Sequence, residues 1–296
     1  MEKINASKTG FFLKLLKQES PLQIIGVINA YNALLAEKSG FNALYLSGAG
    51  IANACFALPD LGLTELHDVT EEVRRITDSC QLPLLVDADT GWSDDYNVAR
   101  TAQQLNKAGA AAMHIEDQVS SKRCGHRPNK VLVSTQQMVD RIKSAVDGRI
   151  DNQFSIMART DAFALEGMNA AIDRANAYIE AGAETIFAEA LIALKDYEQF
   201  SQAVPVPVLA NMTEFGKTPL YTVDELNAAG ISLILYPLSA FRAMSQSALE
   251  VYETIRQQGT QQAVIEKMQT RTELYKVLNY YQYEDDIDQL HRKNND

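Results

Sequence analysis

The sequence predicts a single α/β domain built as a closed (βα)8 barrel, and three observations support this fold. Eight short apolar runs of strand length are separated by longer stretches whose apolar residues recur at helical spacing. The runs are almost continuously apolar, which is typical of parallel strands covered on both faces. Several of the helical stretches end at a glycine just before the next apolar run, as is typical of helix C-termini. These glycines are Gly40, Gly109, Gly182 and Gly230.

The eight predicted strands follow one another at spacings that leave room for a helix between neighbours. They are residues 23–28, 43–48, 83–89, 111–117, 154–160, 185–190, 206–212 and 231–237. The clearest helical patterns cover residues 69–79, 96–108, 135–146, 168–181 and 223–229. An open doubly wound sheet is the alternative, but no phosphate-binding glycine motif follows the first strand, and eight repeated units favour the barrel.

The barrel itself is expected to cover residues 21–257, with a segment outside it at each end. Residues 1–20 predict an N-terminal helical cap, whose apolar side carries Phe11, Phe12, Leu15 and Leu16. Residues 258–296 predict a C-terminal helical extension with clustered tyrosines, and such a cluster favours packing on a neighbouring subunit. Because no Gly/Ser/Pro-rich linker divides the chain, we expect residues 1–296 to form one domain.

The composition limits the kinds of molecule that the protein is expected to bind and the compartment in which it is expected to work. A formal net charge of −11 argues against nucleic acids and anionic membranes, both of which attract excess Lys and Arg. The three cysteines are widely spaced and form no CxxC pair, which fits a reducing cytoplasm. No apolar segment reaches the length of a membrane span and no secretion signal is apparent, so a cytoplasmic location is expected.

One loop of this acidic chain is strongly basic and contains a cysteine. Residues 122–130 read Lys-Arg-Cys-Gly-His-Arg-Pro-Asn-Lys, so Cys124 lies among Lys122, Arg123, Arg127 and Lys130, without an acid. Cationic neighbours lower a thiol pKa, and the loop therefore predicts a partly ionised Cys124 beside a bound anion. The alternative is a solvated basic loop with an inert cysteine.

Polar residues stand at the carboxyl end of nearly every predicted strand. In barrels of this kind, that end of the strands carries the active site. Asp87 and Asp89 are two apart on one predicted strand, which points both side chains the same way. With Glu116 they form an all-oxygen donor set suited to Mg²⁺ or Mn²⁺. Capping of the turn at Thr90 is the alternative role for either aspartate.

Three arginines are candidates for gripping a substrate carboxylate, since a guanidinium binds it through two parallel hydrogen bonds. Arg159 closes the fifth predicted strand and is the best placed; Arg242 follows the eighth. Arg271 lies beyond the barrel, where a surface role is the alternative. His126 is either a base or a polar loop residue, and His114, inside a strand, reads as a core histidine.

These motifs occur together in one arrangement. They are YLSG (45–48), LPDLG (58–62), DADTG (87–91), HIEDQ (114–118), KRCGH (122–126), MARTD (157–161), NMTEFG (211–216), YPLSAFRAM (236–244), MQTR (268–271) and NYYQY (279–283). The combination resembles the isocitrate lyase/phosphoenolpyruvate mutase superfamily over residues 21–284, and most fully its 2-methylisocitrate lyases. The chain departs from their pattern at Ala49, where glycine is usual, and over residues 91–95.

The resemblance implies a (βα)8 barrel whose last helix is exchanged between subunits of a homotetramer. It implies Mg²⁺ near Asp87 and Asp89, with Asp60 and Glu116 close by. It also implies a tricarboxylate substrate bound by a larger set of residues. These are Ser47, Gly48, Ala49, Cys124, Gly125, His126, Arg159, Glu189, Asn211, Met212, Thr213, Arg242 and Arg271.

The implied reaction is cleavage of 2-methylisocitrate to pyruvate and succinate, a step of the methylcitrate cycle of propionate catabolism. Cys124 would act as general acid, while the base stays open between Tyr45, a metal-bound water and a carboxylate. Phe187, Leu235 and Pro237 match the methyl-accepting version of the pocket, and the chain lacks the long insertions of isocitrate lyases. The alternatives are isocitrate lyase, a phosphonopyruvate or oxaloacetate enzyme, and a non-catalytic oligomeric binding protein.

Overall fold

The structure is a computed structural model that describes residue 12, residues 14–92 and residues 97–293. Its contacts divide the chain into two compact units, Met1–Phe241 and Arg242–Asp296, and each is described by itself. The organisation of residues 1–296 as one domain stays a prediction.

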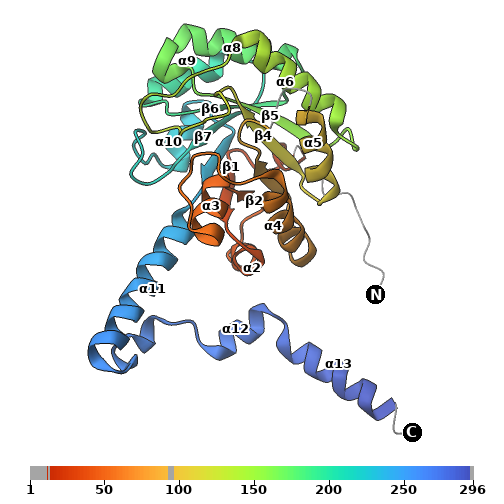
Figure 1. Cartoon of the computed structure of the whole chain (residues 1–296), viewed down its shortest axis with the longest axis vertical. Coiled ribbons are helices and arrows are strands. Elements are labelled where there is room, and N and C mark those ends of the chain that lie inside the picture. The colour runs from red at the N-terminus through yellow and green to blue at the C-terminus, as the bar shows by residue number, and fades with distance from the viewer. Residues whose placement is uncertain (1–11, 13, 93–96, 294–296) are drawn as a thin grey trace. The chain divides into compact units, whose positions relative to one another are not determined.

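The first unit contains a closed barrel of eight strands in sequence order, and every neighbouring pair is parallel. The predicted (βα)8 barrel is therefore confirmed, and Figure 1 shows helices lying outside the strands. The strands are β1 (Leu22–Val27), β2 (Ala43–Leu46), β3 (Leu84–Asp87), β4 (Ala112–Glu116), β5 (Ser155–Thr160), β6 (Thr185–Ala188), β7 (Val208–Asn211) and β8 (Leu233–Tyr236).

The helices of this unit cover the outer face of the strands. They are α2 (Ala30–Lys38), α3 (Gly48–Phe56), α4 (Leu66–Ser79), α5 (Val98–Lys107), α6 (Thr135–Gly148), α7 (Phe163–Glu166), α8 (Met168–Glu180), α9 (Leu194–Ala203) and α10 (Val223–Ala228). The five predicted helical patterns correspond to α4, α5, α6, α8 and α10, although Tyr96 lies outside the described residues. The four punctuating glycines have φ between 78° and 111°, a left-handed conformation that glycine tolerates best.

Two layers of apolar side chains hold the barrel together. One fills the space between strands and helices, and the other fills the barrel interior. Phe12 and Leu15, from the predicted N-terminal cap, belong to the interior layer together with Leu22 and Leu233. Phe12 is fully buried, so this part of the cap closes the barrel interior. The cap residues 1–11 and 13 lie outside the described residues.

We expect Phe12→Ala to lower the free energy of unfolding by about 3 kcal/mol or more, because it leaves a cavity that rigid strands fill poorly. Leu16→Ala, at a side chain only partly buried against the same layer, should cost clearly less. Urea unfolding at one protein concentration measures both values. Equal losses from the two variants would contradict the closing role of Phe12.

The second unit consists of helical segments, as predicted for the C-terminal extension. Helix α11 (Ser239–Gln258) leads into it, followed by a 3₁₀ segment (Gln262–Lys267), α12 (Arg271–Val277) and α13 (Tyr280–Lys293). α11 contains no buried residue. Within the described part of the chain, no helix is long and apolar enough to cross a membrane.

Candidate active site

Residues at the carboxyl ends of the strands meet on one rim of the barrel, as parallel strands require. Asp87 is the last residue of β3, Glu116 is the last of β4 and Arg159 is the next-to-last of β5, and all three are buried. The prediction that Asp89 continues the strand is wrong, because β3 ends at Asp87 and Asp89 has φ of 46°. The two carboxylates still converge, because oxygens of both lie 3.3 Å from the position that a Cβ at Gly48 would take.

The side chain of Lys122 lies within this carboxylate cluster. Its ammonium group forms ion pairs with Asp60 and Asp89, and its side chain is only 5% exposed. Burial disfavours the charged amine, but Asp89, Glu116 and Asp60 outweigh it and raise the pKa of Lys122 well above its usual value. Lys122 is therefore a buried counter-ion of the predicted metal ligands.

The residues present fit a hard divalent cation. Both carboxylate oxygens of Glu116 are buried without a hydrogen-bond partner, and its nearest cation is Arg159 Nη1 at 3.3 Å. A side chain at Gly48 would place its Cβ 3.3 Å from oxygens of Asp87 and Asp89, so glycine keeps this space open. Carboxylate oxygens are the ligands that Mg²⁺ and Mn²⁺ prefer, and Mg²⁺ usually keeps several waters besides one or two carboxylates.

The two aspartates differ in acidity because their neighbours differ. Burial opposes ionisation of Asp87, but His114, Lys122 and Arg159 outweigh it and lower its pKa to about 2. Burial raises the pKa of Asp89 to about 6, with Asp87 adding to the rise and Lys122 opposing it. Positive charge is thus what favours ionisation of the two aspartates against the effect of burial, and a bound divalent ion would supply more.

Tyr45 and His114 lie beneath the carboxylates. The Tyr45 hydroxyl is 2.9 Å from His114 Nε2 and 3.2 Å from Asp87 Oδ2, and the two rings stack. Burial lowers the pKa of His114 to about 4, so the ring is neutral, as predicted for a core histidine. Burial and the charge of Asp87 raise the pKa of Tyr45 well above 10. Tyr45 is therefore a protonated phenol at neutral pH and meets a substrate first as a hydrogen-bond donor.

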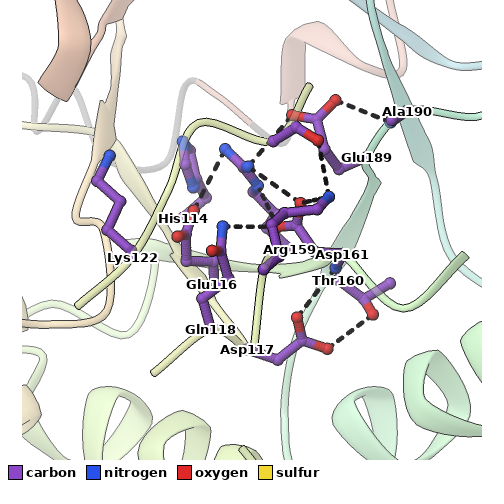
Figure 2. A network of polar contacts seen from close by, with 12 residues as sticks. His114, Glu116, Asp117, Gln118, Lys122, Arg159, Thr160, Asp161, Glu189 and Ala190 are labelled. Atoms are coloured by element: carbon purple, nitrogen blue, oxygen red, sulfur yellow. Dashed lines mark hydrogen bonds and ion pairs between the residues drawn. The ribbon is translucent and has the colours of Figure 1, made fainter. Parts of the chain in front are cut away.

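Arg159 lies between three acids (Figure 2). Its guanidinium contacts Glu116 at 3.3 Å, Asp161 at 3.0 Å and Glu189 at 3.3 Å. Its Cζ also lies 5.1 Å from the ring centre of Phe187, which gives a cation–π contact. A planar guanidinium held on several sides cannot turn away from the rim, so it is preorganised to receive a carboxylate.

The predicted thiol loop folds over this rim as a flap, residues 120–130. An antiparallel bridge between Gln118 and Leu132 closes its base, with a hydrogen bond of 3.0 Å from Val119 N to Val131 O. Two hydrogen bonds join the Gln118 amide to the backbone of Arg123, at 2.8 and 3.0 Å.

Gly125 of the flap packs closely against the rim. A Cβ at this position would lie 2.5 Å from Arg159 Nη2 and 2.6 Å from Glu189 Cγ. No side chain fits there unless the rim or the flap moves, so the backbone beside Cys124 approaches the guanidinium only because residue 125 is glycine.

The four flap cations divide into two pairs. Lys122 and Lys130 are buried and neutralised by acids, whereas Arg123 and Arg127 are exposed. The predicted lowering of the Cys124 pKa is therefore wrong for this structure. Burial raises the pKa of the Cys124 thiol, with Asp60 and Glu189 adding to the rise and His126 and Arg159 opposing it. Cys124 is a protonated thiol, the form that a general acid requires.

We expect alkylation of Cys124 by iodoacetamide to be slow at neutral pH and to rise about tenfold per pH unit to beyond pH 9, because only the thiolate reacts. The measurement needs a Cys55→Ser background, since Cys55 is exposed, whereas Cys80 is buried. An alkylation rate that already levels off below pH 8 would contradict the conclusion that the Cys124 thiol is protonated at neutral pH.

Of the other residues predicted for the rim, some contact Glu189 and others lie at the same end of the strands. His126 Nδ1 accepts from Lys217 N–H at 3.0 Å, and its Nε2 faces Glu189 Oε1 at 3.3 Å. Glu189 in turn contacts Asn211 Nδ2 at 3.4 Å. The others lie at strand ends of the same rim, namely Ser47, which caps α3, Ala49 in its first turn, and the buried Met212 and Thr213.

Arg242 and Arg271 belong to the second unit, so their predicted roles stay predictions. Of the departing stretch 91–95, residues 93–95 lie outside the described residues. The sequence-based prediction did not include Asp161 in the site, although Asp161 contacts both Arg159 and Lys130. Its position two residues after Arg159 was the available signal.

Comparison with known proteins decides the family. Residues 12–256 match the family model described as phosphoenolpyruvate phosphomutase. A 2-methylisocitrate lyase of Escherichia coli (strain K12) is 60% identical over 280 residues, which are 94% of this chain and 95% of that protein. The chain belongs to the phosphoenolpyruvate mutase/isocitrate lyase superfamily.

Solved structures of the superfamily share the fold. A 2,3-dimethylmalate lyase superposes with a TM-score of 0.89 at 32% identity, covering 96% of this chain and 95% of that one. A phosphonopyruvate hydrolase in complex with oxalate and Mg²⁺ gives 0.82 at 25% identity, covering 94% and 97%. The barrel described above is thus the fold that these superfamily enzymes share.

Proposed function

We propose that this protein is a carbon–carbon lyase that cleaves 2-methylisocitrate into pyruvate and succinate. The observation that carries the proposal is the combination of a protonated thiol on a closed flap with a buried carboxylate cluster and a fixed guanidinium. The curated 2-methylisocitrate lyases of Escherichia coli and Salmonella typhimurium, 60% and 58% identical, support the substrate.

We propose Asp87, Asp89 and Glu116, with Asp60 nearby, as the residues that hold Mg²⁺ or Mn²⁺. A bound divalent ion would polarise the hydroxyl and carboxylate of the half that becomes pyruvate. The charge of the rim supports this role. Six acids face three cations within the described contacts, so full ionisation leaves three uncompensated negative charges before a trianionic substrate arrives.

Arg159 binds and orients the succinate half. Its guanidinium is fixed on several sides and lies next to Asn211 through their shared contact Glu189. When the carbon–carbon bond breaks, its electron pair moves onto the carbon of the succinate half and spreads into the adjacent carboxylate. A guanidinium already in place stabilises that negative charge without reorganising.

Cys124 completes the reaction as general acid. The substrate hydroxyl loses its proton to a base, the C–O bond becomes the carbonyl of pyruvate, and the carbanion of the succinate half takes the thiol proton. Burial holds that proton on sulfur until the carbanion forms. The base is open between Tyr45, a water and a carboxylate, and the raised Tyr45 pKa favours one of the latter two.

The preference for the methylated substrate rests on Phe187 and Leu235, each only 1% exposed, together with Pro237. One methyl group in an apolar pocket contributes about 1–3 kcal/mol to discrimination.

We further propose that the chain acts in the cytoplasm as a homotetramer in the methylcitrate cycle. Large apolar side chains exposed on the second unit support the assembly, including Tyr252 at 69% and Tyr283 at 67%.

The metal role is tested by removing and restoring the ion. We expect pyruvate release from 2-methylisocitrate to disappear after EDTA treatment and to return with excess Mg²⁺ or Mn²⁺ but not with Na⁺. Isothermal titration should show Mg²⁺ binding that Asp87→Asn weakens at least about tenfold. Full activity in EDTA would refute the metal role.

A further inference from the structure

The flap ends at a lysine whose side chain turns back to the residue beside the catalytic thiol. Lys130 is the last residue of the flap, and its side chain is 1% exposed. Its Nζ donates to the carbonyl oxygen of Gly125 at 2.7 Å, five residues earlier in the same flap. The residue beside Cys124 is therefore tied to the flap's own C-terminal end.

The other partner of Lys130 lies on the barrel. Its Nζ also pairs with Asp161 Oδ1, and the Asp161 side chain is fully buried. Asp161 follows β5 directly and is fixed from below, because its backbone N–H donates to Asp117 Oδ1 at 2.9 Å. Lys130 thus connects the flap backbone at Gly125 to a rigid strand end.

Asp161 is shared with the substrate-binding arginine. Its Oδ2 accepts from Arg159 Nε at 3.0 Å, and the amide of Gln118 at the flap base reaches the same oxygen at 3.5 Å (Figure 2). One carboxylate therefore sets the position of the guanidinium and, through Lys130, that of the thiol-bearing backbone.

We propose that Lys130 and Asp161 form a positioning pair that fixes Cys124 relative to Arg159 when the flap is closed. Neither side chain is required to touch the substrate, so each acts through another residue. The inference rests on the proposed function, in which Cys124 delivers a proton to a carbanion held by Arg159. Proton delivery depends on ångström-scale placement, and a misplacement of about 1 Å costs on the order of 100-fold in rate.

The first test compares Lys130→Met with Lys143→Met, a matched control at an exposed lysine of α6, both in a Cys55→Ser background. For Lys130→Met we expect kcat to fall about 100-fold while KM for 2-methylisocitrate stays within about threefold. We also expect Cys124 to react with iodoacetamide about tenfold faster, because the flap no longer holds it partly buried.

Unfolding of the barrel would also expose the buried Cys80, so faster alkylation confined to Cys124 identifies release of the flap. An alkylation rate of Lys130→Met equal to that of Lys143→Met would overturn the proposal, whatever the loss in kcat. If the parent protein cleaves no 2-methylisocitrate, the proposed function fails, while the alkylation rates still decide whether Lys130 fixes the flap.

The second test is a double-mutant cycle with Asp161→Asn. Removing one member of a buried ion pair leaves an unpaired charge that can unfold a protein, whereas Lys130→Met with Asp161→Asn removes both charges. We expect the double variant to lose little more kcat than the more impaired single variant. Losses that multiply would overturn the pair, since they would mean that the two residues act independently.

Discussion

Cys124→Ser is expected to lower kcat for 2-methylisocitrate cleavage by about 1,000-fold and to leave KM within about threefold. A serine hydroxyl has nearly the same shape as a thiol but is a far weaker acid, so it cannot protonate the carbanion at a useful rate. Because the thiol acts only after the bond has broken, substrate binding should change little.

Stopped-assay measurement of pyruvate under saturating Mg²⁺ checks both constants. Cys55→Ser is the matched control, since that thiol lies on α3 and is exposed. If Cys124→Ser retains a tenth or more of the parent kcat, Cys124 is not the general acid.

The second large effect is expected at the neighbouring residue. Gly125→Ala would place a methyl group 2.5 Å from Arg159 Nη2 and 2.7 Å from Glu189 Cδ, too close for any real contact. Either the flap lifts or Arg159 turns, and both separate the thiol from the site where the carbanion forms. We expect kcat/KM to fall at least about 100-fold.

Ser121→Ala, at an exposed position on the same flap, is the control and should keep parental activity. Faster alkylation of Cys124 in Gly125→Ala would show that the flap has lifted, and unchanged alkylation would show that Arg159 has turned. Parental kcat/KM in Gly125→Ala would contradict the closed flap described above.

The barrel was predictable because its signals are local. A buried parallel strand must be apolar along its length, and a helix that ends before a strand needs a left-handed residue, so runs and glycines repeat along the chain. Helix α7 was missed because it has only four residues, and α2 and α3 were missed because they lack a clear apolar stripe. Helix α9 was missed without such a reason.

The site was predictable as a set of strand ends but not as a set of contacts. The sequence shows four cations in one loop and does not distinguish Lys122 and Lys130 from the two arginines. In the structure, only the two lysines are buried against acids. Sequence distance does not reveal that Asp60 and Asp161 face this loop, so the local charge count predicted a thiolate. Burial and long-range pairing reverse that prediction.

Parallel assays with 2-methylisocitrate and isocitrate test the central claim most directly. With Mg²⁺ present, the 2-oxo acid released from either substrate is trapped as its phenylhydrazone and followed by absorbance. We predict that kcat/KM for 2-methylisocitrate exceeds that for isocitrate by about 10–200-fold, as one accommodated methyl group allows. Equal values, or a preference for isocitrate, would contradict the account.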